Sequence, residues 1–450
     1  MLRIHMPQSI RYLTTFCLIL GFGQLASAQT EDVVRWIRET AVPFETVAVV
    51  DDLSDLEPLR ELVGSARVVG LGEQTHGTSE FVTMKHRMIQ FLVQEMGFDA
   101  VICEATWGGG LIADRFVSES KGTLDEALSS LEFFMYRNQE FVDLMTWLRQ
   151  HNRSAETPVR LLGMDCTSPH LAFEWIYQAT AFASSTMNSG LLRDIKYRLP
   201  AKAGLRMSQD PADWDLYFGF LDGLAERLST SRPDLDPLLA PLQVEILDRI
   251  PYAIAQTEGH YGFDDSYRNA VGWVPASFNY RDHSMAENVL WWLNLLGPES
   301  KVIVYAHNGH IAKSWTESEC ETLGQNLHQS LGEDYVAFGF STCEGTFVTN
   351  TMDSLGELKP YPIPELAPGS YDELLCQIDI PLCFLPLGTL EPETDAFDWM
   401  NTSRGFMLLG AGHTAENGKI VDVYDLDCTL PEMFDVLIHI RETQGFDLDW

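Results

Sequence analysis

Residues 66–78 read ARVVGLGEQTHGT, and this stretch indicates the fold class of the whole chain. Its first half, residues 66–71, is a short apolar run that predicts a buried strand. A polar segment with Glu73 and His76 follows, and residues 79–96 then show the hydrophobic spacing of a helix that ends at Gly97. A buried strand that leads through a loop into an amphipathic helix is typical of a βαβ unit.

The same alternation continues along the chain. Further strands are predicted at residues 99–104, 159–163, 301–306 and 335–340, with helices at residues 141–151 and 284–296. Such alternation predicts an α/β fold with a parallel-sheet core flanked by helices. Long amphipathic segments replace it from about residue 171 to residue 261. The last hundred residues are rich in Pro and Gly, with short strands at residues 405–409 and 434–440.

These shifts in pattern divide the chain into four parts. They are a signal peptide (1–28), a first α/β half (29–170), a helical insertion or cap (171–262), and a smaller second α/β half with C-terminal strands (263–450). The signal peptide is predicted from Arg3 and Arg11, the apolar run at residues 13–22, and a small-residue cleavage site at residues 26–28. We therefore expect a periplasmic or secreted protein. Gln29 follows the cleavage site instead of Cys, so no membrane anchor is expected.

Composition restricts the class of partner. Of 450 residues, 45% are hydrophobic and 21% are charged, which excludes general disorder. The 65 Asp and Glu outnumber 30 Lys and Arg, and the net charge of −35 argues against nucleic acid or an anionic membrane surface as partner. We expect a small-molecule substrate, and the charge is compatible with a cationic one. The sequence leaves the oligomeric state open.

Titratable and polar side chains follow four of the predicted strands. They are Glu73 and His76 after the first, Glu104 at the end of the second, Asp165 after the third, and His307, Asn308 and His310 after the fourth. Because the carboxyl ends of parallel strands share one edge of a sheet, we expect a functional cleft there. Taken singly, each has a plainer explanation, such as helix capping by the segment around Glu73 or a core position for His307.

Two groups of charged residues carry further expectations. Glu104 ends an apolar strand, where an unpaired carboxylate would be costly, so we expect Arg281 or a histidine as its partner. Lys85, His86 and Arg87 lie on the predicted helix after His76. We expect two of these three to face solvent and one to point back to the cleft.

Several kinds of site are excluded by their missing motifs. The chain has no Gly-x-Ser-x-Gly elbow, no His-Glu-x-x-His and no Cys-x-x-Cys, and the loop at residues 72–78 lacks the Lys of a P-loop. Most cysteines are expected to be small buried hydrophobic residues.

Three alternatives remain for the site. A histidine held by a carboxylate could take a proton from water that attacks an ester or lactone carbonyl. A divalent metal bound by Glu73, His76, Glu104 and His307 could activate the water instead, although no metal is required by the sequence. A protein that only binds a small molecule would seldom need so many titratable groups.

A family resemblance rests on these same residues. Residues 70–78, 85–87 and 104–107 resemble the opening of the erythromycin esterase family, and so do residues 137–140, 163–165, 281–288 and 306–310 in their turn along the chain. Residues 434–440 resemble the strand near the C-terminus of the family. The resemblance implies an α/β fold with a helical portion and a hydrolase that opens a macrolide lactone, an activity of antibiotic resistance. We expect no cofactor, but the resemblance leaves open whether a divalent metal takes part.

The resemblance also implies roles for individual residues. His76 resembles the general base, and Glu73 and Glu104 resemble the carboxylates that hold it and the water. His307 and His310 resemble the second histidine cluster of the family. We therefore expect catalytic roles for His76, Glu73, Glu104, His307 and Arg281, and substrate-binding roles for Lys85, His310, Asp165 and Asn308. Lys85 departs from the pattern of the macrolide-degrading members, so family membership does not establish a macrolide as substrate, and another ester or amide is favoured over it.

Overall fold

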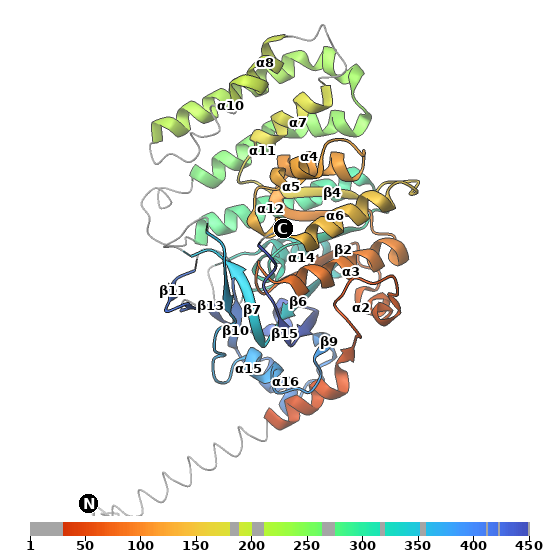
Figure 1. The fold of residues 1–450 in the computed structure, drawn as a ribbon, viewed down its shortest axis with the longest axis vertical. Coiled ribbons are helices and arrows are strands. Elements are labelled where there is room, and N and C mark those ends of the chain that lie inside the picture. The colour runs from red at the N-terminus through yellow and green to blue at the C-terminus, as the bar shows by residue number, and fades with distance from the viewer. Residues whose placement is uncertain are drawn as a thin grey trace, which may run out of the picture.

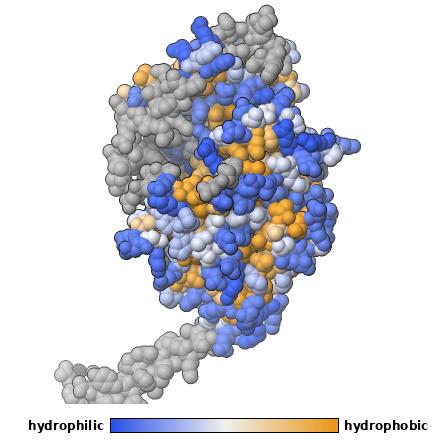
Figure 2. All heavy atoms as spheres, in the orientation of Figure 1, coloured by the Kyte–Doolittle hydropathy of each residue, from blue (hydrophilic) through white to orange (hydrophobic). Residues whose placement is uncertain are grey.

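The computed structural model describes residues 30–180, 189–199, 211–262, 275–315, 320–351, 357–410, 413–421 and 424–448. The signal peptide expected at residues 1–28 lies outside these residues. Within them, no helix is both long enough and apolar enough to cross a membrane. The face shown in Figure 2 is mostly hydrophilic, with small separate hydrophobic patches.

An eight-stranded sheet forms the centre, in the order β1-β9-β14-β6-β2-β5-β3-β4. Six neighbouring strands are parallel, namely β14 (Val436–Ile440), β6 (Tyr335–Ser341), β2 (Val68–Leu71), β5 (Val302–Tyr305), β3 (Ala100–Thr106) and β4 (Arg160–Asp165). β9 (Leu382–Pro386) is antiparallel to β14, and β1 (Val42–Pro43) is antiparallel to β9. The predicted parallel-sheet α/β core is therefore confirmed.

Alternate side chains of the strands enter two hydrophobic cores, one on each face of the sheet. Val68 and Ile102 belong to one core, and their neighbours Val69 and Val101 belong to the other. The second core also contains residues of α2 (Leu59–Val63), α3 (Ser79–Met96) and α6 (Gln139–His151). The first contains residues of α4 (Trp107–Val117), α12 (Pro275–Leu296) and α14 (Leu323–Leu331). Burial on both faces explains why the strands are almost continuously apolar.

α3 begins and ends where the sequence predicts. Gly97 at its C-terminus has a φ of 71°, in the left-handed region that favours glycine. Thr78 precedes the helix, but its hydroxyl pairs with that of Thr75 instead of capping a backbone N–H. α12 begins at Pro275, earlier than the predicted residue 284. Its first turns carry polar and aromatic residues that serve the site described below, and these hide the apolar spacing of a helix.

Helices dominate the segment that was predicted as an insertion or cap. They are α7 (His170–Thr180), α8 (Ser189–Tyr197), α10 (Pro211–Leu235) and α11 (Pro241–Gly262). In Figure 1 they stack at one end of the molecule, beyond β4. α5 (Leu124–Ser130) packs on α4 beside them. The domain boundaries themselves stay a prediction.

Short elements of the C-terminal part lie at the other end of the molecule in Figure 1. The helices are α15 (Tyr371–Leu375), α16 (Asp395–Met400) and α17 (Leu430–Met433). The strands form small sheets of β10 (Arg404–Leu408) with β13 (Tyr424–Cys428), of β11 (Ala415–Glu416) with β12 (Lys419–Ile420), and of β7 (Glu344–Thr349) between β8 (Lys359–Pro362) and β15 (Glu442–Thr443).

Candidate active site

The predicted site residues meet at one edge of the central sheet. β2, β5, β3 and β4 are adjacent and parallel, so their carboxyl ends lie side by side. The loop after β2 brings His76, and the short α13 (Asn308–Ile311) after β5 follows His307. The centroids of these two imidazole rings are 4.8 Å apart. The sheet topology therefore produces the gathering of side chains that the sequence predicts.

Glu73 and His76 form a hydrogen-bonded pair inside the loop after β2. The Nδ1 atom of His76 lies 2.7 Å from Oε1 of Glu73 and donates its proton to that carboxylate. The ammonium group of Lys85, on α3, pairs with the other carboxylate oxygen. Lys85 also lies over the ring of Tyr305, with its Nζ 3.4 Å from the ring centroid. Both oxygens of Glu73 are thus engaged.

His76 keeps its second ring nitrogen available. Its side chain is 10% exposed, and Nε2 makes no hydrogen bond to any residue that the structure describes. The ring of Phe134 meets the imidazole edge-on at 6.3 Å, and a side chain added to Gly410 would come within 3.9 Å of Nε2. In the neutral ring with its proton on Nδ1, Nε2 has a free lone pair. This is the arrangement expected of a general base.

Glu104 and Arg281 are partners, as the sequence predicts. The Nη2 atom of Arg281 donates to Oε1 of Glu104 at 2.9 Å and to Oδ2 of Asp165 at 2.6 Å. The side chain of Arg281 comes from α12, and Asp165 is the last residue of β4. The Nε2 atom of His310 lies 3.1 Å from Oε1 of Glu104. One guanidinium therefore ties the ends of β3 and β4 to α12.

The charges of this group are set by mutual contacts. Burial alone would lower the pKa of His310, but the carboxylates of Asp282 and Glu104 raise it to about 10. Burial alone would raise the pKa of Glu104, but His310 and Arg281 hold it well below its usual range. At neutral pH, Glu104 is therefore a carboxylate and His310 an imidazolium. Nδ1 of His310 lies 2.9 Å from both carboxylate oxygens of Asp282.

His307 is held in one neutral tautomer. Its Nε2 donates to the backbone carbonyl of Gln74 at 3.2 Å, and its Nδ1 accepts from the N–H of Gly309 at 3.2 Å. Burial and the neighbouring His76 hold the pKa of His307 well below its ordinary value. Its backbone N–H donates to Oε2 of Glu104 at 3.1 Å. The ring of His307 contacts that of His76, and its expected catalytic role stays a prediction.

Asn308 and Lys85, both expected to bind substrate, are completely buried. The amide of Asn308 makes two hydrogen bonds to the backbone of Phe340, of 2.8 and 3.0 Å, and so holds the loop after β5 against β6. Burial lowers the pKa of Lys85, against the opposing effect of Glu73. Both residues support the site from behind, and their role toward a substrate stays a prediction.

The expectation that two of the three charged residues on α3 face solvent is wrong. His86 and Arg87 are buried together with Lys85. Arg87 pairs with Asp55, Nη2 to Oδ1 at 2.6 Å, and the ring of His86 lies 5.9 Å from that of Trp147 on α6. α3 is covered by α6 and by the chain before β2, so it has little polar face to expose.

Three residues that contribute to the site were not selected from the sequence. Asp282 holds His310, and its neighbour Arg281 in the motif was the only signal. Gln74 lies inside the first motif, but its role depends on partners far along the chain. Phe278 stacks on the imidazole of His310 at 5.3 Å, and a single aromatic residue gives no signal of such a contact.

The described side chains do not fit the alternative of a metal site. Glu73 and His76 lie in a loop and bond to each other, whereas Glu104 turns toward Arg281. Among the described residues, no three His, Cys, Asp or Glu side chains converge as metal ligands would.

The sequence is similar to a known protein family and to one of its members. Residues 93–443 match the family model described as erythromycin esterase. The chain is 26% identical over 332 residues to erythromycin esterase type II of Escherichia coli, which covers 69% of this chain and 77% of that protein.

Solved structures share the fold. A Bacillus cereus protein superimposes with a TM-score of 0.75 at 26% identity, over 94% of this chain and 99% of that one. A mutant erythromycin esterase, EreC, in its open conformation gives a TM-score of 0.65 at 17% identity, over 91% of this chain and 99% of that one. The second likeness supports the fold alone.

Proposed function

The chain belongs to the erythromycin esterase family of hydrolases, and from this premise we propose that it cleaves an ester bond with water activated by His76. The observation that carries the proposal is the free Nε2 of His76, whose Nδ1 is held by Glu73 at 2.7 Å. A ring fixed in this tautomer presents its lone pair in one direction only. General-base catalysis requires a lone pair aimed at the proton that is to be removed.

In the proposed reaction, a water molecule is hydrogen-bonded to Nε2 of His76 and attacks the ester carbonyl. Its proton passes to Nε2, and the resulting imidazolium is stabilised by the carboxylate of Glu73 through the Nδ1 hydrogen bond. The tetrahedral intermediate then expels the alkoxide of the alcohol, which receives the proton from Nε2. Products are a carboxylic acid and an alcohol, or one hydroxy acid where the ester is a lactone.

Two cations, Arg281 and the imidazolium of His310, lie at the sheet edge that also holds His76, each paired with carboxylates. Arg281 is permanently charged, and the imidazolium of His310 is stabilised by Asp282 and Glu104. Both are nearly buried, so their field is weakly screened by solvent. We assign them to stabilisation of the oxyanion that forms when water attacks. The ring of His307 packs on that of His76 and limits its rotation.

A macrolide lactone or a related ester is the substrate class that the family suggests. The name of the Escherichia coli relative supports erythromycin as the first compound to examine. The net charge of −35 suits a substrate with a cationic amine. We also propose that the protein acts outside the cytoplasm, as the signal-like segment before residue 29 suggests.

Mass spectrometry of the reaction products tests the proposal. Purified protein is incubated with erythromycin and with a panel of simple esters, beside the His76→Ala variant. We expect at least one compound to gain the mass of one water with the wild type and not with His76→Ala. No hydrolysis of any compound, or equal hydrolysis by the variant, would contradict the proposal.

A further inference from the structure

The side-chain amide of Gln74, two residues before His76, is anchored to three distant segments of the chain. Its Oε1 accepts from the backbone N–H of Thr342, directly after β6, at 2.8 Å. Its Nε2 donates to Oδ1 of Asp372 in α15 at 2.7 Å and to the carbonyl of Met407 in β10 at 2.9 Å. Gln74 is completely buried. These contacts fix the loop that carries His76 to the C-terminal part of the fold.

The backbone carbonyl of Gln74 extends this anchoring to the imidazole rings. It accepts from the N–H of Leu409 at 2.8 Å and from Nε2 of His307 at 3.2 Å. The ring of His307 in turn packs on that of His76. A displacement of Gln74 would therefore shift both rings.

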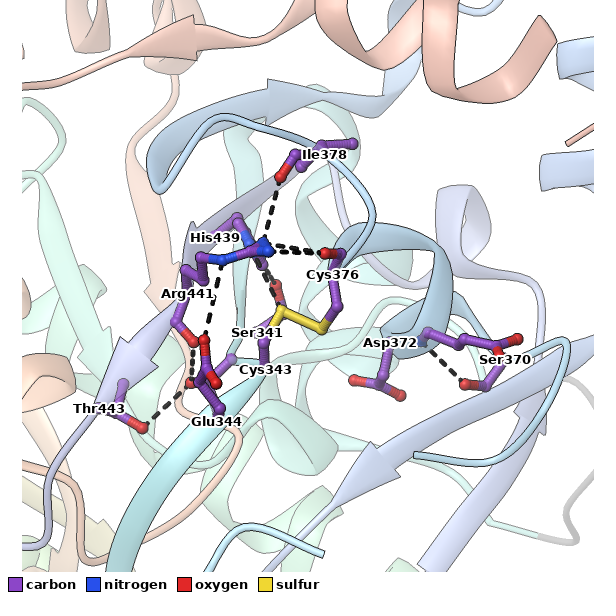
Figure 3. The surroundings of a disulfide bond; sticks show 12 residues. Ser341, Cys343, Glu344, Ser370, Asp372, Cys376, Ile378, His439, Arg441 and Thr443 are labelled. Atoms are coloured by element: carbon purple, nitrogen blue, oxygen red, sulfur yellow. Dashed lines mark hydrogen bonds and ion pairs between the residues drawn. A yellow bond between two sulfur atoms is a disulfide. The ribbon is translucent and has the colours of Figure 1, made fainter. Parts of the chain in front are cut away.

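A disulfide joins the two segments that hold the opposite ends of the Gln74 amide. Cys343 directly follows Thr342, and the N–H of Cys376 donates to the carbonyl of Asp372 at 3.1 Å, one helical turn away. The bond between Cys343 and Cys376 (Figure 3) sets their Cα atoms 5.5 Å apart. The other cysteines among the described residues are buried. The disulfide thus limits the separation of the amide's two partners.

Non-covalent contacts would keep these segments folded without the disulfide. The carbonyl of Arg441 accepts from the N–H of Cys343 at 3.0 Å. Its guanidinium donates to the carbonyl of Cys376 at 2.9 Å and to that of Ile378 at 3.2 Å, as Figure 3 shows. We therefore expect a reduced chain to keep its fold while the two segments gain freedom to move relative to each other.

We propose that Gln74 is a positioning residue for His76 and that the Cys343–Cys376 disulfide fixes the two segments that hold its amide. The inference rests on the proposed role of His76 as the base. With the disulfide closed, Thr342 and the helix of Asp372 keep the distance that the amide spans. With it open, the loop relaxes, and Nε2 of His76 no longer keeps one direction.

A dithiol reductant opens the bond in two balanced steps. A thiolate of the reductant attacks Sγ of Cys376, the S–S bond breaks, and Cys343 leaves as a thiolate. Nε2 of His439 lies 3.8 Å from Sγ of Cys343, and Nδ1 lies 3.0 Å from the hydroxyl of Ser341, so an N–H can meet the leaving sulfur. The second thiol then displaces Cys376 and closes the reductant's own disulfide. Two electrons and two protons pass to the cysteines.

Reaction of His76 with diethyl pyrocarbonate tests the proposal without any substrate. Peptide mass spectrometry measures the rate at which the reagent modifies His76 and the rate at which it modifies His283, whose side chain is 57% exposed. The ratio of the two rates is compared before and after treatment with dithiothreitol. We expect reduction to raise the ratio about threefold or more, because local release increases access to Nε2. The Cys343→Ala/Cys376→Ala variant should show the raised ratio with and without reductant. An unchanged ratio in protein shown by thiol counting to be reduced would overturn the proposal.

A second measurement separates positioning from general stability. Gln74→Met keeps the volume and removes the three hydrogen bonds. We expect kcat for p-nitrophenyl acetate to fall about tenfold with KM within about twofold, since small misplacement of a base slows chemistry more than binding. Adding Asp372→Asn to Gln74→Glu reverses donor and acceptor and should recover part of kcat.

Two outcomes of this measurement have distinct meanings. Full kcat in a Gln74→Met protein with native circular dichroism would overturn the positioning role. Hydrolysis that persists in His76→Ala would overturn the proposed function instead, and the diethyl pyrocarbonate ratio would still decide whether Gln74 and the disulfide hold His76.

Discussion

His76 donates its Nδ1 proton to Glu73 across 2.7 Å, and the second oxygen of the same carboxylate pairs with Lys85. The carboxylate therefore lies between an imidazole and a buried ammonium. The imidazole keeps its tautomer because Glu73 can only accept, and Lys85 fixes the rotamer of Glu73. The orientation of the proposed base is therefore set by Glu73 and Lys85, which a substrate need not touch.

Glu73→Gln is expected to lower kcat about 10²-fold, because an amide stabilises the imidazolium poorly and permits the wrong tautomer. It also leaves Lys85 buried without a carboxylate, at a cost of about 3–5 kcal/mol in the free energy of unfolding. Adding Lys85→Met should restore much of the stability and none of the kcat. Denaturant unfolding and steady-state kinetics measure the two. Recovery of kcat in the double variant would contradict the role of Glu73.

Arg281→Gln should destabilise the protein strongly, by about 3–5 kcal/mol, since Glu104 and Asp165 then lose their shared guanidinium. Arg281→Lys keeps the charge but cannot donate to both carboxylates in the same geometry. We expect it to lower the free energy of unfolding by about half as much as Arg281→Gln does. An exposed control is Arg35→Gln, whose ion pair with Asp32 is worth at most about 1 kcal/mol. The free energy of unfolding is measured in guanidinium chloride. Equal losses for Arg281→Gln and the control would contradict the role of Arg281 as the shared partner of Glu104 and Asp165.

The pKa of His310, raised to about 10 by Asp282 and Glu104 despite burial, makes stability depend on pH in the alkaline range. The contribution is fully present below the unfolded value of about 6.5 and is lost as pH rises to about 10. Histidine NMR signals followed from pH 6 to pH 10.5 check this. One ring should titrate near the upper end, and His310→Gln should remove that signal. Titration of every ring near pH 6.5 would contradict the network.

His86, whose pKa is lowered, makes stability depend on pH in the acid range. Burial lowers its pKa to about 4, and neither ring nitrogen has a hydrogen-bond partner among the described residues. The unfolded chain takes up the proton first, so stability is lost as pH falls from about 6.5 through about 4, by about 2 kcal/mol at pH 5. His86→Leu should flatten this decline in urea unfolding, and the exposed control His283→Leu should not. Identical dependence of stability on pH in the two variants would contradict the lowered pKa of His86.

Chelation should leave the hydrolase unaffected. The carboxylates of Glu73 and Glu104 are turned to different partners, and the described residues bring no set of three ligands together. Turnover is measured after dialysis against EDTA and again after Zn²⁺ has been added back. Loss of activity that Zn²⁺ restores would favour the metal alternative over the base at His76.

Residues around the sheet edge show what the sequence can predict. The strands and α3 follow from apolar runs and helical spacing, and parallel order then places Glu73, Glu104 and His307 at one edge. The pairing of Glu104 with Arg281 follows from the cost of an unpaired buried carboxylate. These inferences need only local pattern and charge balance.

Other features depend on partners that no local pattern reveals. The amide of Gln74 bonds to residues 268, 298 and 333 positions away. The solvent exposure expected on α3 is wrong because Arg87 finds Asp55 and α6 covers His86. Pairing of Cys343 with Cys376 likewise needs the approach of β6 to α15. Such long-range contacts are set by tertiary packing, so the sequence alone leaves them open.

The most direct test of the account is a single turnover in ¹⁸O-labelled water, with protein in excess over erythromycin or the best ester of the panel. Attack by water on the carbonyl predicts one ¹⁸O atom in the product carboxylate from the first turnover of the wild type, and no product from His76→Ala in the same time. Product that contains only ¹⁶O would point to attack by a carboxylate of the protein. That result, or equal turnover by His76→Ala, would contradict a water molecule activated by His76.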